Sequence, residues 1–206
     1  MTIFMSDIIC VTNRTLCEED FLTRLAKTAA AGPAAIILRE KDLSEAQYRE
    51  LAAQALFICS EHGVPCILHS FTNVAIALEA GAIHLPLHLL REMTAAQKKH
   101  FHTIGASCHS TQDAVEAQQL GCTYITAGHI FTTGCKKGLP GRGPEFLKDV
   151  CENVSIPVYA IGGISKDNIA AVRSAGAKGA CIMSGLMRCK DTTEFLNSFM
   201  LKSTVI

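Results

Sequence analysis

Short apolar runs alternate with longer amphipathic stretches along the whole chain. A short continuous apolar run is typical of a buried parallel strand, and apolar positions at helical spacing are typical of a helix with one buried face. The regular alternation of the two patterns predicts repeated strand–helix units. The runs expected to be strands are Ile8–Val11, Ala35–Leu38, Cys66–Leu68, Ala82–Leu85, Thr103–Ser107, Thr123–Ala127, Val158–Ile161 and Ala180–Met183.

The stretches between these runs carry signals that begin and end helices. Ser44 and Gln47 have the spacing of a capping box, in which each side chain binds the backbone N–H of the other residue. Glycines such as Gly176 favour the left-handed conformation that ends a helix. The helices expected are one carrying Phe21–Ala29 and ended by Gly32-Pro33, one opened by Ser44, Asn73–Glu79 ended by Gly81, Thr94–His100, one between Ser110 and Gly121, Glu145–Cys151, one capped by Ser165 that contains Ile169 and Val172, and Thr192–Leu201.

About eight strand–helix pairs with short connections predict a single (β/α)₈ TIM barrel that spans residues 1–206 as one domain. A doubly wound open sheet is the alternative. It normally uses fewer strands, and no G-x-G-x-x-G fingerprint follows the first strand. The closed barrel is therefore the favoured fold.

The composition argues against two classes of binding partner, nucleic acids and membranes. Lys plus Arg and Asp plus Glu number 19 each, so no net charge draws the chain to nucleic acid. The first residues are too interrupted by polar side chains for a signal peptide, and no run of about 18 apolar residues is present to span a membrane. We therefore expect a cytoplasmic protein that binds neither nucleic acid nor membrane.

The chain has ten cysteines, which occur singly and mostly inside apolar runs, without a C-x-x-C pair. Disulfides or a zinc site are the alternatives, but buried free thiols fit this pattern better in a reducing compartment. The eight histidines form no H-E-x-x-H motif. The sequence therefore predicts no metal site.

Two glycine-containing turns follow the seventh and eighth predicted strands. Backbone N–H groups of such neighbouring turns suit a phosphate, and the phosphate site of (β/α)₈ barrels commonly lies there. Short glycine turns also close many loops that bind nothing. The residues expected to bind phosphate are Gly162, Gly163, Ser184 and Gly185.

The residues just after the other strands are mainly basic or neutral, so the barrel mouth is expected to attract an anion. The candidate ligand-binding residues are Arg39, Lys41, Ser107, His109, Thr133 and Lys136, with His69 and His129 at the same level.

Several polar residues near the strand ends also have interpretations that involve no ligand. Arg39, Glu40 and Lys41 could form a solvated or salt-bridged turn. His84 lies inside a strand and is expected to be an interior residue, whereas His100 and His102 are expected on the surface at the opposite end. Cys135 has two lysines beside it, which would lower its pKa, but an unreactive thiol is the simpler interpretation.

His129 differs from the other histidines because it directly follows the sixth strand and opens the longest irregular stretch, GHIFTTGCKKGLPGRG. Long loops in compact domains are usually functional. An imidazole at this position can exchange protons near neutral pH, so His129 is the candidate general acid/base.

The segments LREKDLS, GASCHS, GHIFTTGCKKGLPGRG, IPVYAIGGI and MSG resemble the thiamine-phosphate synthase superfamily over nearly the whole chain. Within it, the loop motif is most similar to the thiazole tautomerase branch, which isomerises a thiazole carboxylate phosphate. The synthase branch usually has Pro in place of His129 and Thr in place of Cys135, while Thr133 and Lys136 fit both branches. The resemblance implies that His129 is the tautomerase's acid/base, and that no metal or redox cofactor is needed.

The resemblance to the synthase branch implies a magnesium site with an Asn-Asp pair after the third strand and an Asp after the fourth. This chain reads LHSFTN and IHLPLHLL there, and has no Asp between Leu43 and Gln112. Ile37, in place of a polar residue, fits neither branch. The alternatives are therefore a thiamine-phosphate synthase with unusual metal ligation, or a catalytically silent phosphate-ligand binder. Self-association into a homo-oligomer is a further implication of the family.

Overall fold

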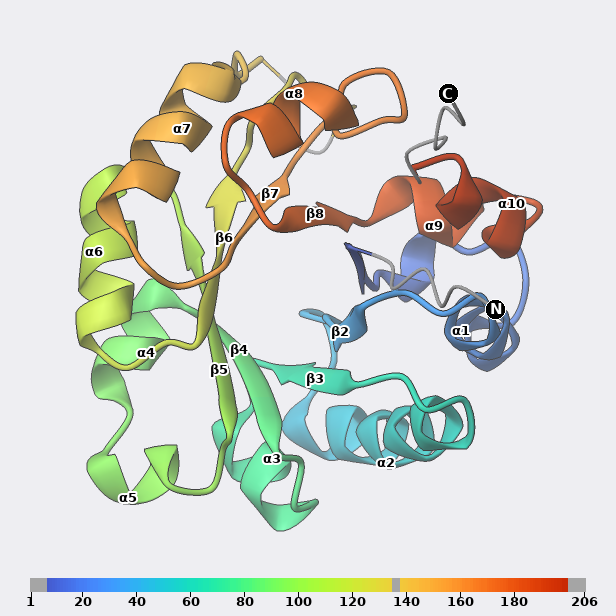
Figure 1. Ribbon diagram of the computed structural model, residues 1–206. Coiled ribbons are helices and arrows are strands. Elements are labelled where there is room, and N and C mark those ends of the chain that lie inside the picture. Colours follow the sequence, from blue (N-terminus) through green and yellow to red (C-terminus); the bar gives the residue numbers. More distant parts are fainter. Residues whose placement is uncertain (1–6, 135–137, 200–206) are drawn as a thin grey trace.

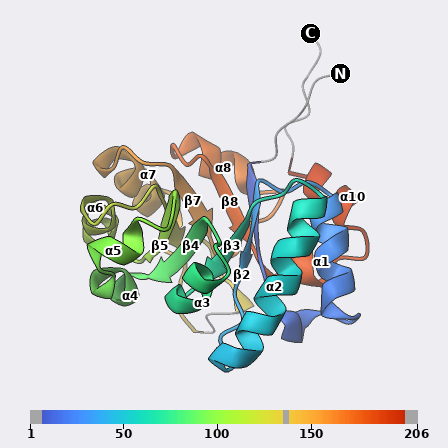
Figure 2. The same cartoon turned by 90° about the horizontal axis from the view of Figure 1, so that it is seen from below.

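The computed structural model describes residues 7–134 and 138–199. Eight parallel strands close into a barrel in chain order, with the last strand paired to the first (Figure 1). The helices lie around the outside of the strands (Figure 2). The predicted (β/α)₈ TIM barrel is confirmed. The strands are β1 (Ile8–Val11), β2 (Ala35–Leu38), β3 (Cys66–His69), β4 (Ala82–Pro86), β5 (Thr103–Cys108), β6 (Tyr124–Gly128), β7 (Val158–Ile161) and β8 (Gly179–Ile182).

A helix or a helix pair follows each strand. Ser44 and Gln47 form the predicted capping box at the start of α2. The helices are η1 (Arg14–Leu16, 3₁₀), α1 (Phe21–Ala30), α2 (Glu45–Glu61), α3 (Thr72–Ala77), α4 (Leu87–Glu92), α5 (Ala95–Lys98), α6 (Thr111–Gln119), α7 (Gly143–Asn153), α8 (Ile169–Ser174), α9 (Ser184–Arg188) and α10 (Thr192–Asn197).

Several expected helix boundaries were wrong. Ser165 does not cap α8, because the helix begins at Ile169 after a turn in which the Ser165 N–H donates to the side chain of Asn168. Residue Glu79, with φ of 52°, takes the left-handed conformation expected of Gly81. The last helix ends at Asn197 within the described residues rather than at Leu201.

Two α-helices, as well as the 3₁₀ helix η1, were not predicted. Helix α4 begins directly after Pro86 and buries Leu87 and Leu90. Proline fixes φ near the helical value and lacks an N–H, so it suits a helix start as well as a strand end. Helix α9 begins at Ser184, where only a glycine turn was expected, so β8 ends at Ile182 instead of Met183.

Apolar side chains form two separate layers. The larger layer lies between the strands and the surrounding helices, and includes Leu38, Ile83 and Leu147. The smaller layer fills the barrel interior, as alternate residues of a strand point to opposite faces. Its buried members are Ile9, Val11, Ala35, Ile37, Ile67, Ala82, Tyr124 and Cys181. In the described part of the barrel, this interior layer fills the space below the mouth and leaves room for a ligand at the carboxyl ends of the strands.

Candidate active site

A cavity of about 350 Å³ opens at the carboxyl ends of the strands. This volume is within the usual range for a small-molecule site. Every described residue that the sequence marked as a candidate lines it, while Lys136 lies outside the described residues. The candidates that line it are Arg39, Lys41, Ser107, His109, His129, Thr133, Gly162, Gly163, Ser184 and Gly185.

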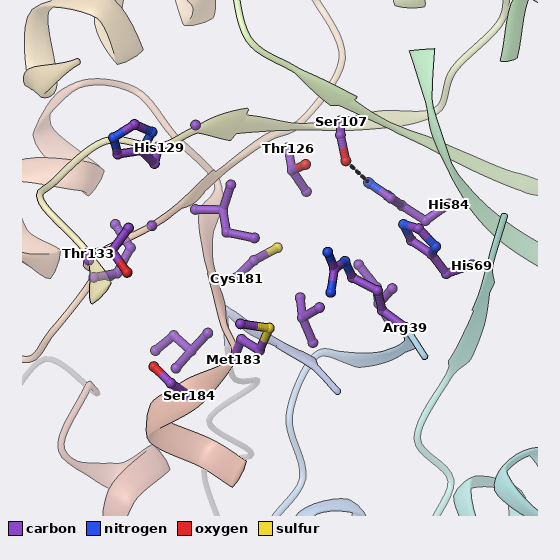
Figure 3. A pocket seen from close by; sticks show the side chains of 18 of the residues that line it. Arg39, His69, His84, Ser107, Thr126, His129, Thr133, Cys181, Met183 and Ser184 are labelled. Atoms are coloured by element: carbon purple, nitrogen blue, oxygen red, sulfur yellow. Dashed lines mark hydrogen bonds between the residues drawn. The ribbon is translucent and has the colours of Figure 1, made fainter. Parts of the chain in front are cut away.

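The cavity has two chemically different sides. Arg39, His69 and His84 lie on one side, and His129 with Thr133 lies on the opposite side (Figure 3). No Asp or Glu is among the described residues that line it. The cavity is therefore locally positive although the whole chain has no net charge.

A buried carboxylate holds the end of β2. Glu40 is buried, accepts a hydrogen bond from the Thr12 hydroxyl at 2.6 Å, and accepts two more from the Arg14 backbone N–H at 3.1 and 3.0 Å. The Thr12 hydroxyl oxygen in turn accepts from the Arg39 backbone N–H at 2.9 Å. The Arg14 guanidinium lies 3.5 Å from Glu40, so this residue of the segment is ion-paired, whereas the ligand role of Arg39 and Lys41 stays a prediction.

His69 is held at the end of β3 by its neighbours. The Tyr48 hydroxyl donates to the Leu38 carbonyl at 2.7 Å and accepts from the His69 backbone N–H at 2.8 Å, which ties β2 to β3. The Nδ1 atom of His69 lies 2.7 Å from the Ser70 hydroxyl. These contacts fix the ring beside that of His84, with 5.8 Å between the ring centroids.

Both histidines are neutral at physiological pH. Burial lowers the pKa of His69 to about 2, with His84, Arg39 and Lys41 adding to the effect. Burial, with the nearby positive charge of Arg39, lowers the pKa of His84 to about 3. His84 is an interior residue, as expected. His69 does not titrate near neutrality, because a buried site disfavours the charged ring.

The glycine turn after β7 is needed for packing as well as for any ligand. Gly162 has φ of 97°, and a Cβ there would lie 2.4 Å from the Cβ of His129. A Cβ on Gly163 would lie 2.5 Å from the Thr132 carbonyl oxygen. The loop after β6 therefore packs against the side of these glycines on which a Cβ would lie, while both glycines also line the cavity.

Helix α9 provides backbone donors next to this turn. The first hydrogen bond of α9 runs from the Met187 N–H to the carbonyl of Met183, the residue that precedes the helix. The N–H groups of Ser184 and Gly185 precede that bond, so they have no intrahelical acceptor. Gly185 itself is required by packing, because a Cβ there would lie 2.4 Å from Phe195.

Backbone hydrogen bonds hold both ends of the loop that carries His129. The Arg142 N–H donates to the His129 carbonyl at 3.0 Å, and the Ile130 N–H donates to the Ile161 carbonyl at 3.0 Å. The His129 Nε2 atom lies 3.4 Å from the Leu139 carbonyl oxygen. Because a carbonyl oxygen only accepts, this contact places a proton on Nε2, and Nδ1 has no hydrogen-bond partner among the described residues.

His109 lies at the exposed rim of the cavity. Its Nδ1 atom donates to the Gly128 carbonyl at 3.0 Å, and its backbone N–H donates to Asp113 at 2.7 Å. The ring thus has one nitrogen engaged and sits next to the strand that leads to His129.

The described residues of the cavity do not fit a magnesium site. Magnesium prefers hard oxygen ligands, usually one or two carboxylates. The ends of β3 and β4 present His69, Ser70 and Pro86. Glu40 already uses its oxygens for Thr12 and Arg14. Across residues 7–134 and 138–199, no group of three or more His, Cys, Asp or Glu side chains is placed to hold a metal.

Sequence reasoning missed four residues that line the cavity or position the residues that line it: Thr12, Tyr48, Tyr124 and Thr126. Thr126 lines the cavity, and the other three position residues that do. Period-two alternation along β6 places Tyr124 and Thr126 on one face, and this signal could have identified them. The roles of Thr12 and Tyr48 depend on partners far along the chain, for which the sequence carries no local signal.

The barrel is closed, and cations and backbone N–H groups line a cavity at the carboxyl ends of its strands. These features define a (β/α)₈ protein with a site for a small molecule. Residues 8–186 match the thiamine monophosphate synthase family. The chain belongs to this family of thiamine-biosynthesis enzymes, so the family expected from the motifs is confirmed.

Curated relatives cover nearly the whole chain. Thiamine-phosphate synthase of Clostridium beijerinckii is 30% identical over 94% of this chain and 95% of its own length. Thiamine-phosphate synthase 2 of Streptococcus pneumoniae is 31% identical over 93% of this chain and 92% of its own length. These names favour the synthase alternative over the tautomerase branch, which the comparisons leave unconfirmed.

Solved structures agree with the family. The thiamine phosphate pyrophosphorylase from Pyrococcus furiosus superposes with a TM-score of 0.79 at 26% identity, covering 93% of this chain and 92% of that one. A 3-hexulose-6-phosphate synthase, at 16% identity and a TM-score of 0.69, shares the fold. Within the described residues, none of the helices is both long and apolar enough to cross a membrane.

Proposed function

We propose that this chain is a thiazole tautomerase, which isomerises a thiazole carboxylate phosphate by proton transfer through His129. The observation that carries the proposal is the position of His129. It lines the cavity from the loop after β6, with Nε2 next to the Leu139 carbonyl, and Nδ1, which has no partner among the described residues, can take a proton. An acid/base group in such a position can remove a proton from one carbon of a bound ring and return it to another.

The charges of the cavity support a ligand with two anionic groups. The backbone N–H groups of Ser184 and Gly185, with the Gly162-Gly163 turn, suit the phosphate. Arg39 and Lys41, which follow β2 and line the cavity, suit the carboxylate. Thr133 and Lys136 are proposed to contact the ligand from the loop. The ligand would thus be held at both ends with its ring near His129.

The proposed reaction conserves the atoms of the substrate. His129 Nδ1 takes a proton from one carbon of the substrate, and the resulting electron pair is shared with the ring. The imidazolium then returns a proton to the other carbon, which restores neutral His129. No metal or redox cofactor takes part in these steps.

The second candidate function is thiamine-phosphate synthase, which the names of the curated relatives favour. That reaction releases diphosphate, whose developing charge needs a stabilising cation. The lack of carboxylates in the described part of the cavity argues against a magnesium ion in that role. Arg39 and Lys41 are the described cations that could replace it.

One NMR experiment tests both candidates. The purified protein is mixed with thiazole carboxylate phosphate in deuterated water, and isomerisation and deuterium uptake are followed with and without EDTA. We expect turnover that EDTA does not affect. In a parallel sample with thiazole phosphate, pyrimidine diphosphate and magnesium, we expect no thiamine phosphate. A magnesium-dependent yield of thiamine phosphate without isomerisation would establish the synthase instead.

His129→Asn tests the role of the imidazole. A positioned acid/base typically contributes roughly a hundredfold to ten-thousandfold in rate, so we expect the isomerisation rate to fall by at least about a hundredfold. Ligand affinity should stay near that of the unmutated protein. His100→Asn is the matched control, because this histidine is exposed and does not line the cavity. Near-normal turnover by His129→Asn would make His109 or Cys135 the next candidate.

A further inference from the structure

Three side chains from neighbouring strands form a hydrogen-bonded chain at the floor of the cavity. The Tyr124 hydroxyl of β6 lies 2.9 Å from His84 Nδ1 of β4. His84 Nε2 lies 2.9 Å from the Ser107 hydroxyl of β5, the bond drawn in Figure 3. Only Ser107 and His84 line the cavity, whereas Tyr124 is buried below them.

Gly105 allows Tyr124 to reach across a whole strand. In the sheet register, His84 pairs with Gly105, and Gly105 pairs with Tyr124. A Cβ on Gly105 would lie 2.2 Å from Cζ of the Tyr124 ring. The ring therefore occupies the space that a side chain on β5 would fill, and this places its hydroxyl against His84.

The direction of each hydrogen bond follows from burial. Tyr124 is 6% exposed, and its hydroxyl has no other hydrogen-bond partner among the described residues. Burial raises the pKa of Tyr124 well above its ordinary value, so the hydroxyl keeps its proton. A buried hydroxyl that donated to nothing would be costly, and Tyr124 therefore donates to His84 Nδ1.

The direction of the bond between Tyr124 and His84 determines the direction of the bond between His84 and Ser107. With a pKa lowered to about 3, the ring is neutral and carries one proton. Since Nδ1 accepts from Tyr124, that proton is on Nε2, which donates to the Ser107 oxygen. The hydroxyl hydrogen of Ser107 cannot point at His84, and Ser107 lines the cavity. The hydrogen is left to point toward a ligand.

We propose that Tyr124 is a positioning residue, which sets the His84 tautomer so that Ser107 offers the ligand a hydrogen-bond donor. The matching group on the ligand is an acceptor, either a ring nitrogen lone pair or a carboxylate oxygen. This inference rests on the proposed function only for the identity of that ligand. The tautomer itself is a property of the free protein.

The first arm of the test is ¹⁵N NMR of the histidine rings in the ligand-free protein. We expect His84 to show an unprotonated Nδ1 and a protonated Nε2 at neutral pH. Tyr124→Phe should abolish this fixed tautomer, while Tyr159→Phe should not. Tyr159 packs edge-on against Tyr124 with ring centroids 5.9 Å apart, and its hydroxyl is not part of the chain. A protonated Nδ1 in the unmutated protein would overturn the positioning role.

The second arm is a double-mutant cycle on the affinity for thiazole carboxylate phosphate. Tyr124→Phe should weaken binding by about fivefold to tenfold, the effect of one neutral hydrogen bond. In a Ser107→Ala background the same change should have no further effect, because Tyr124 acts only through Ser107. An equal loss in both backgrounds would overturn the proposal. Failure of the unmutated protein to bind this compound would contradict the proposed function, while the tautomer measurement would still decide the role of Tyr124.

Discussion

His129 packs directly on the α-carbon of Gly162, so closely that a Cβ on Gly162 would come within 2.4 Å of the His129 Cβ. The position of the candidate acid/base on the loop after β6 therefore depends on a glycine of the next strand's turn. The hydrogen bond from the Phe131 N–H to the Gly162 carbonyl, 3.0 Å long, fixes the same contact.

Gly162→Ala should displace His129. Gly162 has φ of 97°, and left-handed geometry costs an alanine about 1–2 kcal/mol. The clash should add about 1–3 kcal/mol. Gly121→Ala is the matched control, because Gly121 has φ of 93° and nothing within 4 Å of the added Cβ. Chemical unfolding and the ring NMR signals of His129 would measure both effects, and only Gly162→Ala should move the ring signals. Equal losses of stability in the two variants would contradict the clash.

Glu40→Ala should destabilise the protein by about 2–4 kcal/mol, because it leaves the buried Thr12 hydroxyl and the Arg14 N–H without their acceptor. Asp42→Ala removes the other carboxylate beside Arg14. The side chain of Asp42 is 56% exposed. An exposed ion pair contributes at most about 1 kcal/mol, so this control should be nearly neutral. Urea unfolding would compare the two, and similar values would show that Glu40 is not a structural support of the β2 end.

The buried histidines should make the protein sensitive to acid. Their folded-state pKa values, about 2 for His69 and about 3 for His84, lie below the ordinary value of 6.5. Below about pH 6.5 the unfolded chain binds protons that the folded protein does not, so stability falls as the pH falls. Each histidine should contribute a slope of about 1.4 kcal/mol per pH unit between roughly pH 6 and 4.

His69→Asn should remove one such slope. Unfolding free energies measured by urea titration at several pH values would test it, with the exposed His100→Gln as control. We expect the control to keep the full pH dependence. An unchanged slope in His69→Asn would mean that this ring takes up a proton without unfolding.

Ser184→Asp should abolish binding of inorganic phosphate, because the new carboxylate would occupy the N-terminus of α9 with a like charge. The same carboxylate should leave stability unchanged or slightly raised. Ser184→Ala keeps the backbone N–H and should bind phosphate nearly as well as the unmutated protein. Isothermal titration calorimetry would measure both, and phosphate binding by Ser184→Asp would place the anion elsewhere in the cavity.

The order of the strands and the location of the site at their carboxyl ends were predictable, because both depend on patterns within short segments of the sequence. Apolar runs such as Ala35–Leu38 are buried on both faces, so their composition alone identifies them as parallel strands. In a barrel, the residues after each strand must meet at one mouth, which brought Arg39, Ser107 and His129 into one cavity.

Tertiary structure alone decided how these residues are held and protonated. The neutral state of His69 follows from burial by distant elements, which no local pattern reports. Gly105 looks like an ordinary strand residue, yet its missing side chain is what admits the Tyr124 ring. Hydrogen bonds such as that between Tyr124 and His84 join residues far apart in the chain, and only the register of the closed barrel places their atoms within bonding distance.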